Sequence, residues 1–254
     1  MSYRCGGRVF GMELKRYFAA VMVLLIVVSV FSVVSVWAQG PPELQKVVFV
    51  HYAGKKPPKP PGGENAYYKL IAGGVKWRST ATIEVNPTNS DLSSKSVLDA
   101  VTVSAEEWDD GDYSGWGGVS PNLFQVNMKL SEKTYDDLAW TSGKLDGANT
   151  LVWGNYPTSG VIAVTIMWYN TATKTMVEFD MVFDTDYAWS ISGEAGKMDL
   201  QNIATHELGH GAGLSDLYSN AAYQETMYGY SDFGEVSKRD LYAGDIQGIT
   251  RLYG

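Results

Sequence analysis

The sequence predicts an α+β domain with a mixed sheet, and three observations support this fold class. The chain has 254 residues, 45% of them hydrophobic, which is enough for one sizeable core. Segments with strand-like alternation and segments with helical spacing interleave from residue 67 to residue 254. We find no internal repeat, and the 27 glycines follow no collagen period.

Each predicted element follows from a local pattern. Residues 82–85 are typical of a strand that Pro87 ends, and Ser96–Trp108 has the apolar spacing of an amphipathic helix. Residues 124–130 alternate like a half-buried strand, while residues 161–168 form an unbroken apolar run typical of a central strand. After a polar turn at 170–174, residues 177–183 alternate again, which predicts a hairpin. Asp199 can cap a helix that runs to about Gly211, and residues 246–253 indicate a short closing helix.

The first 38 residues resemble a secretory signal peptide. Residues 17–38 carry no charge and are almost all apolar, and four basic residues precede them (Arg4, Arg8, Lys15 and Arg16). The small residue Ala38 predicts cleavage after it. An uncleaved N-terminal anchor is the alternative, because roughly 20 apolar residues can span a bilayer. In both cases we expect the rest of the chain to be secreted or to face outward.

The charge balance excludes some partners. The chain has 20 basic and 28 acidic side chains, a net charge of −8, which argues against nucleic acid and against anionic lipid surfaces. Removing residues 1–38 takes away four basic residues, one acidic residue and the single cysteine, Cys5, and leaves a net charge of −11. The exported part is therefore expected to lack disulfides and thiol chemistry.

Residues 39–66 are interpreted as a proline-rich tether or a short pro-segment before a domain that spans 67–254. The run from Lys55 to Gly63 favours a stiff polyproline II spacer. Val47–Val50 is compatible with a strand or with part of the pro-segment. His51 is expected to be exposed to solvent.

The most informative stretch begins at His206. His206 and His210 are four residues apart, so both project from one side of a helix and can meet one metal ion. Glu207 then lies beside the ion, where its carboxylate can accept a proton from water. Gly211 and Gly213 can end the helix and return Asp216 to the ion as a third, oxygen ligand.

This segment resembles the extended motif of metzincin metallopeptidases, HExxHxxGxxH, in the Asp-ending form of snapalysin-type enzymes. Residues 225–230 resemble the Met-turn of the matrixin branch, with Met227 below the metal. Residues 238–254 resemble the end of a matrixin catalytic domain, and the resemblance covers about residues 67–254. It implies a zincin-like fold with an active-site helix, a second backing helix and a short C-terminal helix. It also implies one catalytic zinc ion and a peptide substrate extended along an edge strand, for which 176–183 is our candidate.

Two features depart from the matrixin pattern. Asp216 stands where the family usually has a third histidine, so the ligand set is more anionic and metal-activated water should be less acidic. Matrixin zymogens are held inactive by a propeptide cysteine. Cys5 precedes the predicted signal sequence, so we reject it as such a switch and expect any latency to have another basis.

Further candidate sites are less specific. Tyr228 and Tyr230 are possible pocket residues. Acidic turns could hold calcium, although acidic turns are usually only solvated. These are Asp109, Asp110 and Asp112 in one turn and Asp184 and Asp186 in another.

Together these features predict a secreted, monomeric zinc endopeptidase that acts on peptides or proteins. The ligands would be His206, His210 and Asp216, and Glu207 would be the general base. Two alternatives remain: a binding or adhesion module that keeps the fold without cleaving, and a structural domain stabilised by zinc. Glu207 argues against the first, because a binding module needs no base. The second is weakened because His51 is the only further histidine or cysteine that the predicted mature chain offers as a fourth ligand.

Overall fold

The structure is a computed structural model that describes residues 43–54, 67–109 and 122–254. The predicted signal peptide with Cys5 and the proline-rich run lie outside the described residues. The predicted acidic-turn ligands Asp110 and Asp112 lie outside them too.

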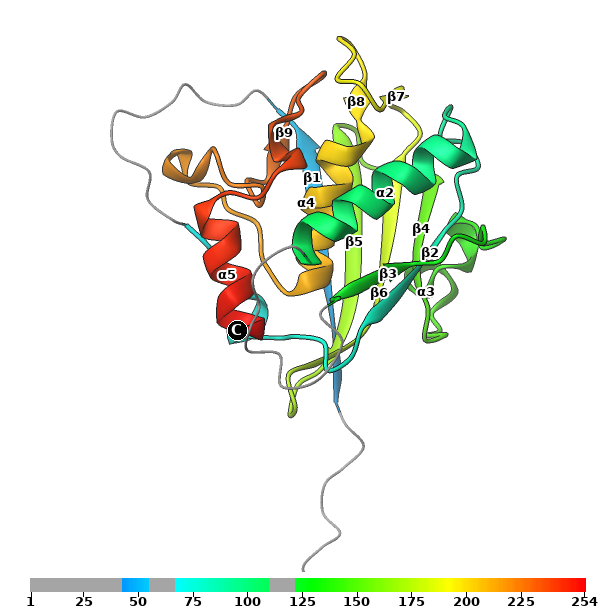
Figure 1. The fold of residues 1–254 in the computed structure, drawn as a ribbon. Helices are drawn as coiled ribbons and strands as arrows, with labels where there is room; N and C mark the ends of the chain where they lie inside the picture. The colour runs from blue at the N-terminus through cyan, green and yellow to red at the C-terminus, as the bar shows by residue number, and fades with distance from the viewer. Residues whose placement is uncertain (1–42, 55–66, 110–121) are drawn as a thin grey trace, which may run out of the picture. The chain divides into compact units, whose positions relative to one another are not determined.

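A seven-stranded mixed sheet is the main element, with strand order β3-β2-β4-β6-β5-β1-β9 (Figure 1). Neighbouring pairs are antiparallel at β5–β6 and β1–β5, and parallel at β2–β3, β2–β4, β4–β6 and β1–β9. A small second sheet pairs β7 with β8. The strands are β1 (Leu44–Ala53), β2 (Ala81–Val85), β3 (Phe124–Val126), β4 (Asn149–Gly154), β5 (Val161–Asn170), β6 (Thr175–Asp184), β7 (Trp189–Ser190), β8 (Met198–Asp199) and β9 (Tyr230–Ser231).

Three longer helices accompany the sheet, as the sequence predicts: α2 (Ser94–Asp109), α4 (Leu200–Ala212) and α5 (Ala243–Tyr253). The α+β class with a mixed sheet is therefore confirmed. Short helical turns complete the described part of the chain, at η1 (Ile71–Gly73), η2 (Tyr135–Asp137), α3 (Ala139–Ser142), η3 (Asn220–Ala222) and η4 (Ser237–Arg239).

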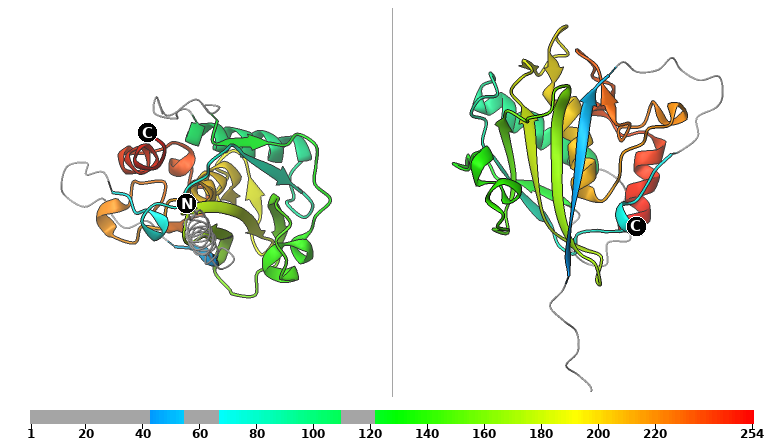
Figure 2. Two further views of the ribbon diagram at one scale, coloured as in Figure 1. Left: turned by 90° about the horizontal axis from the view of Figure 1, so that it is seen from below. Right: turned by 180° about the vertical axis from the view of Figure 1, so that it is seen from behind.

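The main core lies between the sheet and the helices α2 and α4, which cover the same face of the sheet (Figures 1 and 2). Trp108 at the end of α2 is fully buried and donates a 2.8 Å hydrogen bond from Nε1 to the carbonyl of Thr205 on α4. Leu208 of α4 and Phe179 of β6 are also fully buried in this core. Helix α4 is thus held by apolar packing and by a buried hydrogen bond.

The opposite face of the sheet carries a smaller apolar cluster. Val164, Ile166 and Trp168 of β5 are buried in it, and Val50 of β1 packs against them. Because side chains alternate along a strand, β5 is buried on both faces, as its unbroken apolar run predicts.

Two predictions about strands are wrong. The segment 176–183 is not an edge strand, because β6 pairs with β4 on one side and with β5 on the other. The strand predicted for 124–130 ends at Val126, and the side chains of Met128 and Leu130 are exposed. Alternation alone indicates a strand, but it does not show which strand lies at an edge.

The first described segment belongs to the sheet. β1 lies within the range 39–66 that was interpreted as a tether, yet it pairs with β5 from Leu44 to Tyr52 (Figure 2). The prediction that His51 is exposed is also wrong, since this side chain is 1% exposed. Alternate side chains of a strand lie on the same face, so His51 lies on the same face as Phe49. This face packs against the core between the sheet and the helices, which buries His51.

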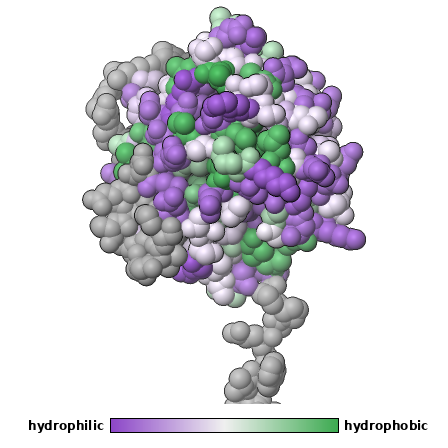
Figure 3. All heavy atoms as spheres, turned by 45° about the vertical axis from the view of Figure 1, so that its right-hand side comes forward, coloured by the Kyte–Doolittle hydropathy of each residue, from purple (hydrophilic) through white to green (hydrophobic). Residues whose placement is uncertain are grey.

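Among the described residues, no helix is both long enough and apolar enough to cross a membrane. The predicted anchor at 17–38 lies outside this part of the chain. On the face drawn in Figure 3, hydrophobic residues form small patches that hydrophilic side chains separate.

Candidate active site

Helix α4 positions the motif, and both of its ends are capped as the sequence predicts. The carboxylate of Asp199 accepts a 3.1 Å hydrogen bond from the backbone N–H of Asn202, which is N-cap geometry. Gly213 closes the helix with φ 112°, a left-handed conformation that glycine adopts without strain. Gly211 lies inside the helix rather than ending it.

The two histidines of α4 present their Nε2 atoms to the same point. Nδ1 of His206 lies 2.7 Å from the carbonyl oxygen of Thr226, and Nδ1 of His210 lies 2.8 Å from that of Leu214. Since a carbonyl only accepts hydrogen bonds, Nδ1 carries the proton in both rings, and each Nε2 keeps a lone pair. This tautomer is the one that a metal requires.

Asp216 completes the grouping. Its Oδ1 lies 3.2 Å from Nε2 of His206 and 3.4 Å from Nε2 of His210, and its Oδ2 accepts a hydrogen bond from the hydroxyl of Tyr218. Oδ1 of Asp216 and Nε2 of His206 are buried and have no hydrogen-bond partner. Buried polar atoms are normally satisfied, so two such atoms that face each other fit a cation between them.

The pKa values of His206 and Asp216 agree with this interpretation, whereas that of His210 reflects the unscreened carboxylates around it. Burial and the charge of Lys238 lower the pKa of His206 to about 4, so its imidazole is neutral and able to bind a metal. Burial alone would raise the pKa of Asp216, but His210 and His206 hold it well below its usual range. Burial lowers the pKa of His210, but the carboxylates of Asp216 and Glu207 and the carbonyl of Leu214 together outweigh it, so the pKa is raised. The group is two imidazoles and an anionic carboxylate.

Glu207 lies beside this group and is fully buried. Its Oε2 accepts a 2.6 Å hydrogen bond from the hydroxyl of Thr165 on β5, and its Oε1 lies 3.1 Å from Nδ1 of His51 on β1. Burial raises the pKa of Glu207 to about 7. A carboxylate with this pKa can both accept and release a proton near neutral pH.

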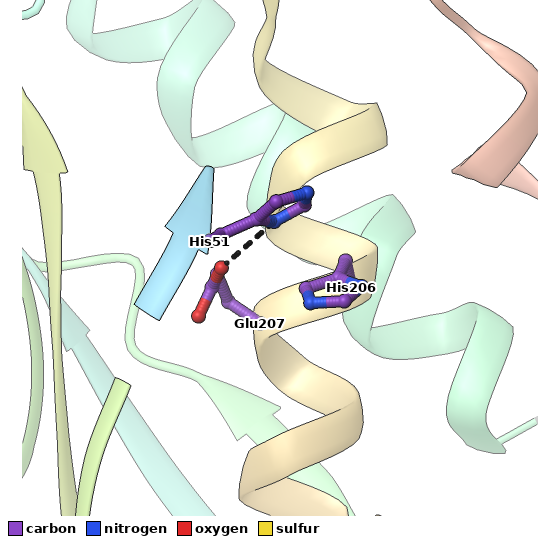
Figure 4. Close-up of side chains that lie close together, drawn as sticks. All are labelled: His51, His206 and Glu207. Carbon is purple, nitrogen blue, oxygen red and sulfur yellow. Dashed lines mark hydrogen bonds and ion pairs between the residues drawn. The ribbon is translucent and has the colours of Figure 1, made fainter. Parts of the chain in front are cut away.

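His51 reaches the site from a distant part of the sequence (Figure 4). Its ring centroid lies 3.9 Å from that of His206, and its Nε2 lies 3.1 Å from the hydroxyl of Ser231 and 3.3 Å from Nζ of Lys238. Burial and the nearby charges of His206 and Lys238 lower its pKa. His51, His206 and Glu207 form a second group of possible metal ligands that shares His206 with the first group.

The segment predicted as a Met-turn lies against helix α4, where Met227 is next to Gly209. Met227 is buried, and Thr226 supplies the carbonyl that orients His206. The buried carboxylate of Asp245 accepts hydrogen bonds from the backbone N–H groups of Thr226 and Met227, at 2.7 and 3.2 Å. Helix α5 therefore holds the turn that orients His206.

Known proteins are similar in sequence to the part of the chain that contains this site. The matrixin family model matches residues 159–254, which contain β5, β6, α4 and the Met-turn. The chain carries a matrixin-like metzincin domain. It is 40% identical over 75 residues to macrophage metalloelastase from Oryctolagus cuniculus, a match that covers 30% of this chain and 15% of that protein. It is 24% identical over 189 residues to stromelysin-1 from Mus musculus, with 74% and 35% covered.

A third relative of the matrixin-like domain is the hatching enzyme of Paracentrotus lividus, 26% identical over 187 residues. That match covers 73% of this chain and 27% of the relative. The chain therefore spans about a third or less of the length of these curated relatives.

The less specific candidates stay predictions. Tyr228 of the matrixin-like domain is buried, Tyr230 is partly buried, and their ring centroids lie 5.8 Å apart. Asp109 and Asp184 accept backbone hydrogen bonds, as carboxylates in turns often do. Within the described ranges, groups of three possible ligands occur only around His206, so calcium lacks support from a preformed cluster there.

Sequence reasoning missed four residues around the matrixin-like site: His51, Thr165, Lys238 and Asp245. Each comes from another element than α4. Lys238 and Asp245 lie in the 238–254 segment that resembles the end of a matrixin domain, but no role was predicted for them. One signal for His51 was available, because Val47, Phe49, His51 and Ala53 alternate at the period of a strand. That pattern places His51 on an apolar face, which is incompatible with exposure.

Proposed function

We propose that this chain is a secreted zinc endopeptidase that hydrolyses peptide bonds in peptides or proteins. The observation that carries the proposal is the convergence of Nε2 of His206, Nε2 of His210 and Oδ1 of Asp216 next to the buried carboxylate of Glu207. The names of the relatives support the same activity.

The three converging side chains would hold the metal. Two imidazole nitrogens and one carboxylate oxygen form a donor set that zinc accepts, and three protein ligands leave one position open for catalysis. The buried atoms of His206 and Asp216 that lack hydrogen-bond partners support the assignment of such an ion to these residues. When bound, zinc supplies Lewis-acid chemistry, in that it polarises the scissile carbonyl and makes water more acidic.

Glu207 would move the proton. Thr165 holds Oε2, so Oε1 is the oxygen that is able to accept the proton of the attacking water. The raised pKa, about 7, allows the same carboxyl group to donate that proton to the leaving amine. Removal of this base would leave the metal ligands in place.

The decisive experiment compares wild type with Glu207→Gln on a quenched peptide, with added zinc and with a chelator. Gln keeps an oxygen that can accept the hydrogen bond from Thr165, so the variant is close to isosteric. We expect the wild type to cleave in a chelator-sensitive way, and the variant to bind zinc equally and lose about 100-fold or more in rate. Equal cleavage by both would contradict the role of Glu207. Zinc binding without cleavage by either would favour a binding or adhesion module.

Export of the domain is proposed from residues 1–38, whose basic and apolar regions are those of a signal peptide. N-terminal sequencing of the protein from the medium tests this. A first residue of Gln39 would support cleavage after Ala38. An intact N-terminus in the membrane fraction would support the anchored alternative.

A further inference from the structure

Strand β1 runs through the candidate active site. It pairs antiparallel with β5 along its length, from Leu44 opposite Asn170 to Tyr52 opposite Val161. Since β6 occupies the other side of β5, the β1 side is where a further extended chain could add to β5. Two of its side chains then contact the residues that the proposed function assigns to catalysis.

Phe49 and His51 make these contacts. The ring of Phe49 stacks on His210, with the centroids 4.0 Å apart and the planes 10° apart. His51 lies 3.1 Å from Oε1 of Glu207, the oxygen that Thr165 leaves without a bond (Figure 4). The same strand thus covers one proposed ligand and the reactive oxygen of the proposed base.

The pairing of β1 with β5 has the form by which an extended peptide adds to a sheet edge. Extended peptides that bind at a sheet edge do so through backbone hydrogen bonds, with alternate side chains in pockets. β1 has this arrangement: Phe49 and His51 face the site, while Val50 between them packs on the opposite cluster of Val164, Ile166 and Trp168. An extended substrate cannot use the same side of β5 while β1 is paired there.

We propose that β1 is an autoinhibitory strand, an intramolecular occupant of the peptide-binding side of β5 that an extended peptide substrate must displace. The proposal rests on the proposed function and adds a regulatory contact to it. Such a strand would supply latency without a cysteine switch, and it agrees with the pro-segment alternative for residues 39–66.

The test weakens β1 from the face that does not touch the site. Val50→Asp in the full-length chain places a charge against apolar side chains, which disfavours docking of β1. Val48→Asp is the matched control, because it makes the same change on the same strand at a side chain that is 41% exposed. Circular dichroism and thermal melting show that each variant is folded.

Binding is measured without reference to catalysis. A fluorescent synthetic peptide with the sequence of residues 43–54 is titrated into each chain and followed by anisotropy. We expect Val50→Asp to bind it about tenfold or more tightly than wild type and Val48→Asp, because its own strand leaves the groove more often. A double variant, Phe49→Ala with His51→Ala, removes the site contacts without adding a charge, and should also bind more tightly than wild type. Equal affinities in all four chains would overturn the proposal.

Cleavage separates the two claims. With zinc, Val50→Asp should cleave a quenched peptide about tenfold faster than wild type, and the 43–54 peptide should inhibit it. If Val50→Asp binds the peptide more tightly but cleaves no faster than an active wild type, the autoinhibitory role is wrong and substrates use another edge. If Val50→Asp binds the 43–54 peptide more tightly but neither it nor wild type cleaves, β1 is still a displaceable strand. In that case the proposed peptidase function is wrong.

Discussion

The hydroxyl of Thr165 on β5 donates a 2.6 Å hydrogen bond to Oε2 of Glu207 on α4, and both groups are buried. This contact joins the sheet to the site helix. It occupies one carboxylate oxygen, while the other lies 3.1 Å from Nδ1 of His51 on β1, so in the proposed mechanism Oε1 is the oxygen assigned to proton transfer.

Thr165→Val should therefore lower catalytic activity but leave zinc binding unchanged. Valine has nearly the same shape but cannot donate, and a hydrogen bond to a charged group contributes about 1.5–3 kcal/mol, so we expect kcat/KM to fall about tenfold or more. Thr165→Ser keeps the hydroxyl and should retain most activity. Zinc content, measured by elemental analysis, should be unchanged in both; equal rates for Val and Ser would contradict the positioning role.

Asp216→Ala should reduce zinc affinity, because only two protein ligands would remain. Loss of an outer-shell partner alone typically costs 10–100-fold in metal affinity, and loss of a direct ligand should cost at least about 100-fold. Competition with a chromophoric chelator measures the effect. Asp99→Ala, at an exposed helix position, is the control and should bind zinc like wild type. Unchanged zinc affinity in Asp216→Ala would refute its ligand role.

Gly209→Ala should destabilise the domain although alanine favours helices. A Cβ at Gly209 would overlap the sulfur of Met227 and would lie 2.7 Å from the ring of Trp108. Overpacking of this kind costs about 1–3 kcal/mol, which exceeds the gain of about 1 kcal/mol in helix propensity. Gly211→Ala in the same helix approaches Phe179 no closer than 3.1 Å and should cost less. Urea unfolding measures both, and equal losses would show that the contact with Met227 is easily relieved.

Asp180 on β6 should make stability depend on pH. Burial raises the pKa of its carboxyl from 3.8 to about 7, although the backbone N–H groups of Ala139 and Thr150 bond to it. Between these pH values the folded state binds more protons than the unfolded state. The contribution of Asp180 to the free energy of unfolding is therefore fully present below about pH 4 and is lost as the pH rises through 7. The change is at most about 4 kcal/mol.

The measurement for Asp180 is the free energy of unfolding of wild type minus that of Asp180→Asn, at several values between pH 4.5 and 8. Since Asn does not titrate, this difference should decrease as the pH rises. Asp99→Asn provides the control at an exposed site and should give a nearly constant difference. A difference that stays constant for Asp180 over this range would show that the carboxyl is ionised in the folded state, and would contradict the raised pKa.

Local patterns were sufficient for the three longer helices, for β2, β5 and β6 and for the motif on α4, but not for β4 or for the place of β1 in the sheet. The helix cap at Asp199, the left-handed Gly213 and the i, i+4 histidines all depend on residues a few positions apart, so sequence spacing determines their geometry. The two apolar strands and the turn between them also predicted the β5–β6 hairpin, because its contacts are local.

The tertiary structure alone decided which strand lies beside the site and what covers it. Both β5 and β6 have strand patterns, so the sequence does not show which of them pairs with which neighbour. In the structure β6 pairs with β4, and β5 pairs with β1. His51 and Glu207 are 156 positions apart, and Thr165 and Glu207 are 42 apart. Contacts of this separation depend on strand order and register, which period-two alternation does not specify. The candidate ligands were thus readable from the chain itself, whereas the strand that lies beside them followed from packing.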